Sequence, residues 1–222
     1  MSIPPVLYKY TSAKTAKLIL ESRSLMFSAA EDFNDPCEGL FCPSLVGDTP
    51  AHWTEDDDER YQLMLAAWKQ EIGILCLTER PYNMTMWSHY AEGHSGACLQ
   101  FAMPLFGDNV AGVSKVEYRR DVLRFDMADM PNHPEIFWTK GAEWDYEREW
   151  RLIKIPPEPF QSTAGLEPIE PSRLKRVILG ANTTDRDAAK IRALADQWPS
   201  DVPVVQALVH RTQYLIHVPG VT

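Results

Sequence analysis

Short segments rich in apolar, aromatic and β-branched residues recur along the whole chain, separated by Gly, Pro, Asn or Asp. The clearest is Ile-Leu-Cys-Leu at 74–77, which is apolar throughout, follows Gly73 and is too short for a buried helix. The chain is therefore expected to fold around β-sheets. Further strands are predicted at residues 6–10, 25–28, 96–102, 113–118, 146–155, 173–179, 204–209 and 214–218.

Three stretches between these strands repeat apolar residues at spacings of three and four, which is typical of helices. The first follows Thr11 or Ser12, either of which can cap a helix N-terminus. The second begins after Thr54, and its acidic run 55–59 suits the positive end of a helix dipole. The third is predicted at 185–198.

The 222 residues are predicted to form a single domain, 1–222, of the α+β class, with helices flanking mixed or antiparallel central sheets. An apolar share of 45% and a charged share of 24% are ordinary for a folded protein. Residues 43–54 and the Pro-rich segment 156–171 are expected to be surface loops. No internal repeat or low-complexity tract divides the chain.

The formal charge of −9 argues against broad, charge-driven binding to nucleic-acid backbones or anionic membranes. No apolar run approaches the roughly 18–20 residues of a membrane span, and the N-terminus lacks the pattern of a signal peptide. We therefore expect a cytoplasmic protein. The four Cys residues show no paired CxxC spacing and are expected to be reduced and structural, with no bound metal. A metal held by Cys37, Cys42 and His52 is the less favoured alternative, because His52 is the only imidazole near these two thiols.

Residues 86–94 bring hydroxyl, imidazole and phenol side chains together soon after the strand at 74–77. Ser88, His89 and Tyr90 can bond a polar ligand while the aromatic faces stack on a flat ring. The alternative is an ordinary helical turn that Ser88 caps and whose aromatic residues belong to the core. A zinc pair is not indicated, because His89 and His94 are five positions apart rather than three or four.

The segment 143–153 carries acidic, basic and aromatic residues in close succession. On one continuous strand, Glu147, Glu149 and Arg151 share a face, because side chains alternate. Two carboxylates at that spacing raise each other's proton affinity unless Arg151 or a ligand cation compensates. This strand face is therefore a candidate for one side of an active site. A solvated ladder of salt bridges is the alternative. The opposite face would carry Trp144, Tyr146, Trp150 and Leu152.

Two shorter segments are weaker candidates. Asn34, in Asn-Asp-Pro at 34–36, could contact a ligand or only form a turn. On the first strand, Lys9 lies between Tyr8 and Tyr10, and a lysine between aromatics can meet an anionic or aromatic ligand. A lysine on an edge strand is the alternative explanation.

Several of these segments, in this order and spacing, resemble the large bacterial family called domain of unknown function 2971. The matching segments are Leu-Tyr-Lys-Tyr at 7–10, Phe-Asn-Asp-Pro at 33–36, Met-Trp-Ser-His-Tyr-Ala at 86–91, the run 144–152, and Val-Ile-Leu-Gly at 177–180. The resemblance covers nearly the whole chain. It supplies no activity, but it implies that these segments build a shared site.

The order of elements also resembles the ADP-ribosyltransferase fold, including DarT-like toxins. That resemblance implies a cleft for NAD, in which Glu149, the second Glu of Glu-x-Glu, is catalytic and Glu147 helps to position the acceptor. The first element departs from the superfamily, because Tyr8, Lys9 and Tyr10 stand where an Arg or His is usual. Ser88-His89-Tyr90 matches the middle element only loosely.

The favoured hypothesis is therefore an NAD-consuming enzyme, either an ADP-ribosyltransferase or an NAD glycohydrolase. Glu149 would stabilise an oxocarbenium-like ribose, and Tyr90 or Tyr10 would stack on nicotinamide. The pyrophosphate would be met by Lys9, His89 or Arg151. The partner is NAD or a related nucleotide, with a protein or nucleic acid as a possible acceptor.

Two alternatives stay open from the residues. A metal-dependent nuclease or other phosphodiesterase would hold a divalent ion with Asp35, His89, Glu147 and Glu149. A non-catalytic module would sense a nucleotide or a partner protein. Toxin and phage-defence roles are frequent in such families, but no residue of this sequence indicates either.

Overall fold

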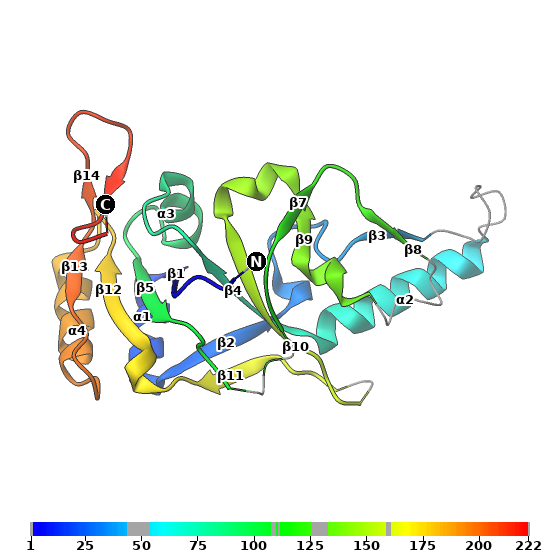
Figure 1. Cartoon of the computed structure of the whole chain (residues 1–222), viewed down its shortest axis with the longest axis horizontal. Helices are drawn as coiled ribbons and strands as arrows, with labels where there is room; N and C mark the ends of the chain where they lie inside the picture. Colours follow the sequence, from blue (N-terminus) through cyan, green and yellow to red (C-terminus); the bar gives the residue numbers. More distant parts are fainter. Residues whose placement is uncertain are drawn as a thin grey trace.

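The computed structural model describes residues 2–43, 54–107, 110, 112–125, 133–158 and 161–221. Among them, nine strands form one sheet in the order β11-β2-β4-β1-β5-β12-β13, and β10 pairs with both β4 and β6 (Figure 1). β12 and β13 are parallel and the other pairs are antiparallel, so the sheet is mixed. The bounds are β1 Val6–Thr11, β2 Ser24–Ala29, β4 Gly73–Thr78, β5 Ala97–Ala102, β6 Gly112–Lys115, β10 Glu149–Lys154, β11 Gly165–Pro168, β12 Leu174–Leu179 and β13 Val204–Gln206.

Three small sheets border the large one. β3 (Phe41–Pro43) pairs with β8 (Leu123–Phe125), and β7 (Glu117–Arg119) pairs with β9 (Thr139–Gly141), both in parallel. Near the C-terminus, β14 (Leu208–Val209) and β15 (Ile216–His217) form an antiparallel pair.

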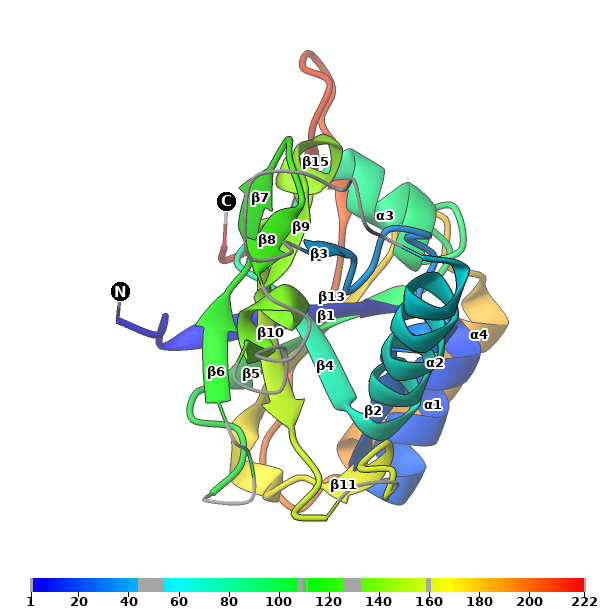
Figure 2. The same cartoon turned by 90° about the vertical axis from the view of Figure 1, so that its right-hand side faces the viewer.

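Helices cover the sheet unevenly. In Figure 2, α1, α2 and α4 lie to the right of β4, while β7 and β8 of the small sheets lie to its left. The α-helices are α1 Ala13–Ser22, α2 Glu55–Glu71, α3 Met84–Tyr90 and α4 Asp185–Asp196. Short 3-10 helices occur at η1 Ala30–Asp32, η3 Pro134–Trp138, η4 Ala142–Glu147 and η5 Pro171–Arg173. Within the described ranges, no helix is long and apolar enough to cross a bilayer.

Side-chain caps fix the starts of the three longer helices. Ser12 accepts a hydrogen bond from the Thr15 backbone N–H. Thr54 and Asp57 bond each other's backbone N–H groups in a capping box at the start of α2. Thr184 caps α4. All three helices begin where the sequence predicted, because these caps satisfy backbone donors that lack a partner within the helix.

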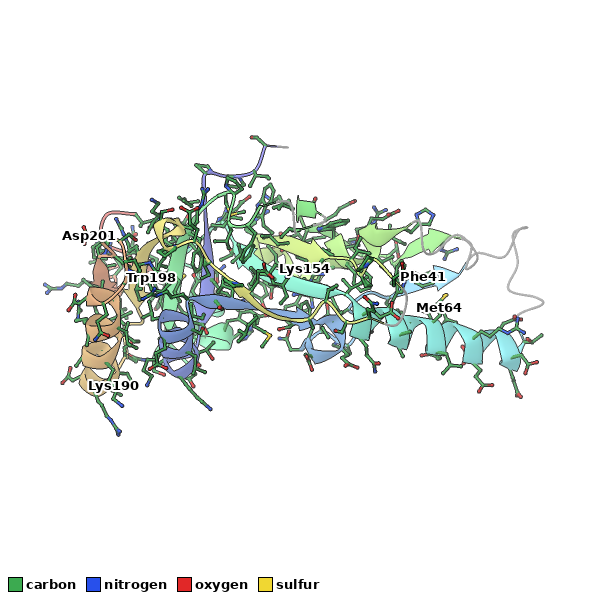
Figure 3. All side chains as sticks on the ribbon, turned by 90° about the horizontal axis from the view of Figure 1, so that it is seen from below. Phe41, Met64, Lys154, Lys190, Trp198 and Asp201 are labelled. Atoms are coloured by element: carbon green, nitrogen blue, oxygen red, sulfur yellow. The ribbon has the colours of Figure 1, made fainter. Side chains whose placement is uncertain are left out.

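The buried apolar residues fall into clusters spread along the molecule. Trp198 lies near one end, in the cluster under α1 and α4, while Phe41 and Met64 lie near the other end, in the cluster beside α2 (Figure 3). A third cluster packs α3 against β1, with Tyr10 edge-on to Trp87 at 5.0 Å between ring centroids. α1 and α4 thus bury their apolar sides in one cluster, α2 in a second and α3 in a third.

β1 and β4 separate after a short shared stretch. β1 pairs with β5 over its whole length, from Val6 to Thr11, whereas its register with β4 joins Tyr8 to Thr78. β4 instead pairs along its length with β10. The sheet therefore opens between β1 and β4, and side chains from both strands face the opening.

The predicted α+β class with a mixed sheet is confirmed, but several strand predictions were wrong in their extent. The strand expected at 146–155 begins only at Glu149, because residues 142–147 form η4 and Arg148 takes a left-handed conformation with φ 48°. Tyr146 and Glu147 therefore do not follow strand alternation, and the two expected faces hold only from Glu149 onward.

Four further segments differ from the prediction. The strand expected at 113–118 is interrupted at Val116, because β6 pairs with β10 and β7 with β9. The strand expected at 204–209 breaks at Ala207, and the one at 214–218 is reduced to β15. The expected loop at 156–171 contains β11, which pairs with β2. The loop expected at 43–54 lies, apart from its ends, outside the described residues, and so does His52.

Leu99 tests the packing of the central strand β5. Its side chain is fully buried in the cluster under α1 and α4, so Leu99→Ala is expected to lower the free energy of unfolding by about 2–5 kcal/mol through lost contacts and a cavity. Leu18→Ala on the exposed side of α1 is the control, and is expected to change it by no more than about 0.5 kcal/mol. Urea denaturation measures both values, and equal losses would contradict this account of the core.

Candidate active site

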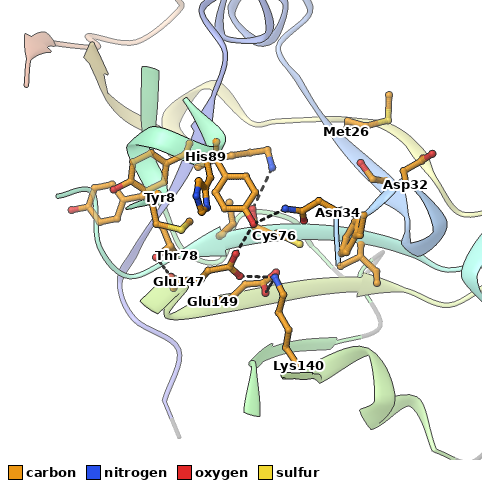
Figure 4. Close-up of a pocket in the computed structure, with 18 residues that line it drawn as sticks. Tyr8, Met26, Asp32, Asn34, Cys76, Thr78, His89, Lys140, Glu147 and Glu149 are labelled. Atoms are coloured by element: carbon orange, nitrogen blue, oxygen red, sulfur yellow. Dashed lines mark hydrogen bonds and ion pairs between the residues drawn. The ribbon is translucent and has the colours of Figure 1, made fainter. Parts of the chain in front are cut away.

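A pocket of about 400 Å³ lies at the opening between β1 and β4 (Figure 4). Six further segments complete its wall. The lining residues are Tyr8, Lys9 and Tyr10 on β1, Met26 and Ser28 on β2, Asp32, Phe33 and Asn34 at the end of η1, Ile74, Cys76, Leu77 and Thr78 on β4, Met86, His89 and Tyr90 on α3, Lys140 on β9, Glu147 on η4 and Glu149 on β10. The segments that the sequence singled out near residues 8, 34, 89 and 148 therefore border the same hollow.

Glu147 and Glu149 share one lysine at the wall of this pocket. Lys140 Nζ donates to Glu147 Oε2 at 2.6 Å and lies 3.7 Å from Glu149 Oε2. All three residues are buried. The left-handed turn at Arg148 places the last residue of η4 and the first residue of β10 at the same cavity, although they belong to different elements.

Arg151 donates hydrogen bonds to Glu149 and does not itself line the pocket. Its Nε and Nη2 donate to Glu149 at 3.0 and 3.2 Å, and its Nη1 and Nη2 donate to Glu38 at 2.5 and 2.9 Å. Nη1 also donates to the Phe137 carbonyl at 2.6 Å. All five guanidinium protons are thus used. Arg151 is fully buried outside the pocket lining, so it has no N–H left for a pyrophosphate.

The two carboxylates have opposite pKa shifts. Burial raises the pKa of Glu149, but the charges of Arg151 and Lys140 outweigh that effect and hold it below its usual value. Burial also raises the pKa of Glu147, and there the charge of Lys140 does not cancel the effect. Glu149 therefore gives up its proton more readily than Glu147, and Glu147 is the more basic of the two.

Tyr90 lines the pocket beside Glu147. Its hydroxyl donates to Glu147 Oε1 at 2.5 Å and accepts from Asn34 Nδ2 at 3.4 Å. Burial and the Glu147 carboxylate raise the pKa of Tyr90, so the phenol stays protonated. Next to it, His89 Nδ1 lies 3.2 Å from the Tyr146 hydroxyl.

The β1 side of the pocket carries a half-buried lysine. Lys9 Nζ donates to the Cys76 carbonyl at 3.3 Å and forms no ion pair with any described residue. Burial lowers the pKa of Lys9, with partial opposition from Cys76 and Glu149. The neighbouring Tyr10 hydroxyl is already engaged, because it donates to the Arg80 carbonyl and accepts from the Asn83 backbone N–H.

The structure brings together most of the residues that the sequence singled out, and leaves out two. Ser88 is exposed on α3 and does not line the pocket, and Arg151 lies behind the wall. Eight line the pocket: Tyr8, Lys9, Tyr10, Asn34, His89, Tyr90, Glu147 and Glu149.

Lys140 and Glu38 were missed in the sequence. Lys140 reaches Glu147 because the chain reverses through η4. Had residues 142–147 been predicted as a helix, the contact between Lys140 and Glu147 could have been predicted as well. Glu38 is 113 residues from Arg151 and carries no local signal of the contact.

A metal centre is not apparent in the part of the chain that the structure describes, where no group of three His, Cys, Asp or Glu side chains is arranged to hold a metal ion. The Lys140 ammonium lies between the two carboxylates, in the position that a divalent ion would take. Asp35, the other acidic ligand of the nuclease hypothesis, does not line the pocket.

Comparisons with known proteins agree with the sequence resemblance over part of the chain. The family described as protein of unknown function DUF2971 matches residues 86–152, which run from α3 to β10 and include Tyr90, Glu147 and Glu149. A search of curated proteins finds none that matches. Among solved structures, DarT of Thermus sp. 2.9 in complex with carba-NAD+ is similar at 11% identity and a TM-score of 0.40, covering 93% of this chain and 96% of that chain.

Removing the Arg151 charge is expected to leave Glu38 buried without its ion-pair partner and Glu149 with only the Lys140 ammonium at 3.7 Å. Arg151→Met should therefore lower the free energy of unfolding by about 3–5 kcal/mol. Without the cation, burial places the pKa of both carboxylates above their unfolded values, so the deficit should shrink as the pH falls and both take up protons. Denaturation at several pH values measures it.

Arg119→Met is the matched control, because Arg119 forms an exposed pair with Glu117. This substitution is expected to lower the free energy of unfolding by at most about 1 kcal/mol. A loss in Arg151→Met that is equally small, or that grows as the pH falls, would contradict the role given to this guanidinium.

Proposed function

We propose that the pocket binds NAD and that the protein breaks the bond between nicotinamide and ribose, passing ADP-ribose to an acceptor or to water. The observation that carries the proposal is the Glu149 carboxylate, held ionised at the pocket wall by Arg151 and Lys140. Cleavage of this bond passes through an oxocarbenium-like state, as glycoside cleavage does. A fixed anion beside the ribose would stabilise that state.

The charged groups around Glu149 favour the positive charge that would develop on the ribose during bond cleavage. Three buried carboxylates, Glu38, Glu147 and Glu149, contact two buried cations, Lys140 and Arg151. The cluster therefore has one more acidic group than basic group. Because Arg151 and Lys140 are themselves tied to these acids, Glu149 keeps its position as charge appears and needs no reorganisation.

Aromatic rings provide the surface for a flat ligand ring. Tyr8, Phe33, His89 and Tyr90 line the pocket from three separate elements, and stacking on such rings suits nicotinamide. Tyr10 also lines it, but its hydroxyl is used within the protein, so its contribution is the ring alone.

Lys9 is the residue best placed for the pyrophosphate. Its ammonium lines the pocket with one backbone partner and no carboxylate, so protons are available to an anion. His89 is a second candidate at the same cavity. ADP-ribosyl transfer and NAD hydrolysis share all of these requirements and differ in the acceptor.

A metal-dependent phosphodiesterase is the main competing function. It would need a divalent ion between Glu147 and Glu149, where Lys140 Nζ lies. Nucleic-acid cleavage that disappears with chelator would favour it. A nucleotide that raises the melting temperature without forming any product would favour a sensing module.

The role of Glu149 is tested by its isosteric amide. Glu149→Gln should lower kcat for nicotinamide release by about 10²–10³-fold, the usual effect of losing one preorganised group that stabilises the transition state. Glu143→Gln is the control, since Glu143 is exposed on η4 and outside the pocket. Nicotinamide release is followed with purified protein and NAD. If the wild type releases none, or if Glu149→Gln is as active as the wild type, the proposal fails.

The role of Lys9 is tested by the pH dependence of NAD binding. Lys9 is charged only below its lowered pKa, so NAD affinity should fall as the pH rises through that value. At low pH, where Lys9 of the wild type is charged, Lys9→Met should bind NAD about tenfold more weakly because it lacks that charge, and its affinity should not show this pH dependence. Calorimetry measures both. Lys14→Met, on the exposed side of α1, should bind as the wild type does; matching pH profiles for wild type and Lys9→Met would exclude this role.

A further inference from the structure

On the basis of the proposed function, we infer that Tyr90 and Glu147 together take the proton of the acceptor, and that this acceptor is neutral and protic, such as water or an alcohol. Tyr90 touches the acceptor and Glu147 lies behind it. The resemblance to ADP-ribosyltransferases implied that Glu147 helps to position the acceptor, and did not assign a role of this kind to Tyr90.

Both oxygens of Glu147 are covered by donors. Tyr90 Oη donates to Oε1 at 2.5 Å, and Lys140 Nζ donates to Oε2 at 2.6 Å. The residue is only 3% exposed. An acceptor in the pocket therefore meets the Tyr90 hydroxyl before it can meet this carboxylate.

The Tyr90 hydroxyl can accept a further hydrogen bond. A phenol oxygen accepts through two lone pairs, and the Asn34 amide uses one of them over a long 3.4 Å contact. Tyr90 itself is half-buried and lines the pocket. A hydroxyl group of the acceptor can thus donate to Tyr90 while Tyr90 donates to Glu147.

The same arrangement disfavours a guanidinium acceptor. A guanidinium binds best to a carboxylate that faces it with both oxygens free, and Glu147 offers neither. The Lys140 ammonium beside Glu147 also repels a second cation. A neutral hydroxyl suffers neither penalty.

The proton transfer is balanced. As the acceptor oxygen bonds to the ribose C1′, the C1′–N bond breaks and nicotinamide leaves, neutral, with the bonding electrons. The acceptor proton moves to Tyr90 Oη while the Tyr90 proton moves to Glu147 Oε1, which ends as a neutral acid and later returns the proton to water. The raised pKa of Glu147 makes it a better base for this step than an ordinary glutamate. The titratable groups facing Glu147 are Lys140 on β9, Glu149 on β10, Tyr90 on α3, Tyr146 on η4 and Tyr118 on β7.

The experiment compares nucleophiles that differ in whether they must lose a proton. Wild type, Tyr90→Phe and the control Tyr82→Phe are incubated with NAD in water, with methanol, with azide or with agmatine. Tyr82 is a suitable control because it is partly exposed and outside the pocket. Products and nicotinamide are quantified, and melting temperatures verify that each variant is folded.

We expect the wild type and Tyr82→Phe to form ADP-ribose and its methyl glycoside, with no agmatine adduct. Tyr90→Phe should release nicotinamide about a hundredfold more slowly with water or methanol, the usual contribution of a general base. Azide should restore release and give the ADP-ribosyl azide, because an anion needs no base. A purely structural role for Tyr90 would not produce rescue that depends on the nucleophile.

Each contrary result is informative. If the wild type releases no nicotinamide, the proposed function fails and this inference fails with it. If the wild type is active, the inference alone is overturned by undiminished Tyr90→Phe activity, by slow activity that azide leaves unchanged, or by transfer to agmatine comparable to that to methanol. Should Tyr90→Phe not fold, Glu147→Gln takes its place in the same assay, with the same loss and the same azide rescue expected.

Discussion

The buried Arg151 guanidinium is the interaction on which the rest of the site depends. Its five protons are shared among Glu38, Glu149 and the Phe137 carbonyl, so one side chain joins β10 to η3 and to Glu38, which is 113 residues away in sequence. Burying these charges is costly, and only complete pairing offsets that cost. Complete pairing also means that Arg151 serves to fix Glu149 rather than to bind a ligand.

The opening between β1 and β4 turns this fixed carboxylate into part of a pocket. Had β1 paired with β4 along its length, backbone hydrogen bonds would occupy the space that Lys9 and Cys76 now border. Instead β4 pairs with β10, which brings Glu149 opposite Thr78 at the same end of the sheet. The pocket therefore lies between two well-paired halves of one sheet.

Two neighbouring glutamates acquire different chemistry from this setting. Glu149 faces Arg151 and Lys140 and is held ionised, whereas Glu147 faces one cation and one phenol and is more basic. A fixed anion next to a stronger base suits a reaction in which positive charge develops at one atom and a proton leaves another. The difference arises from the partners of each residue, because both side chains are almost fully buried.

The sequence by itself determined the α+β class, the starts of α1, α2 and α4, and most of the residues that meet at the pocket, because caps, apolar spacing and clusters of polar aromatics act locally. The tertiary structure decided the rest. The left-handed Arg148 ended the expected strand alternation, and long-range pairing placed Glu38 on Arg151 and excluded Ser88 from the cavity. Such outcomes depend on which distant segments fold against each other, and a buried charge chooses its partner by position in space rather than by spacing along the chain.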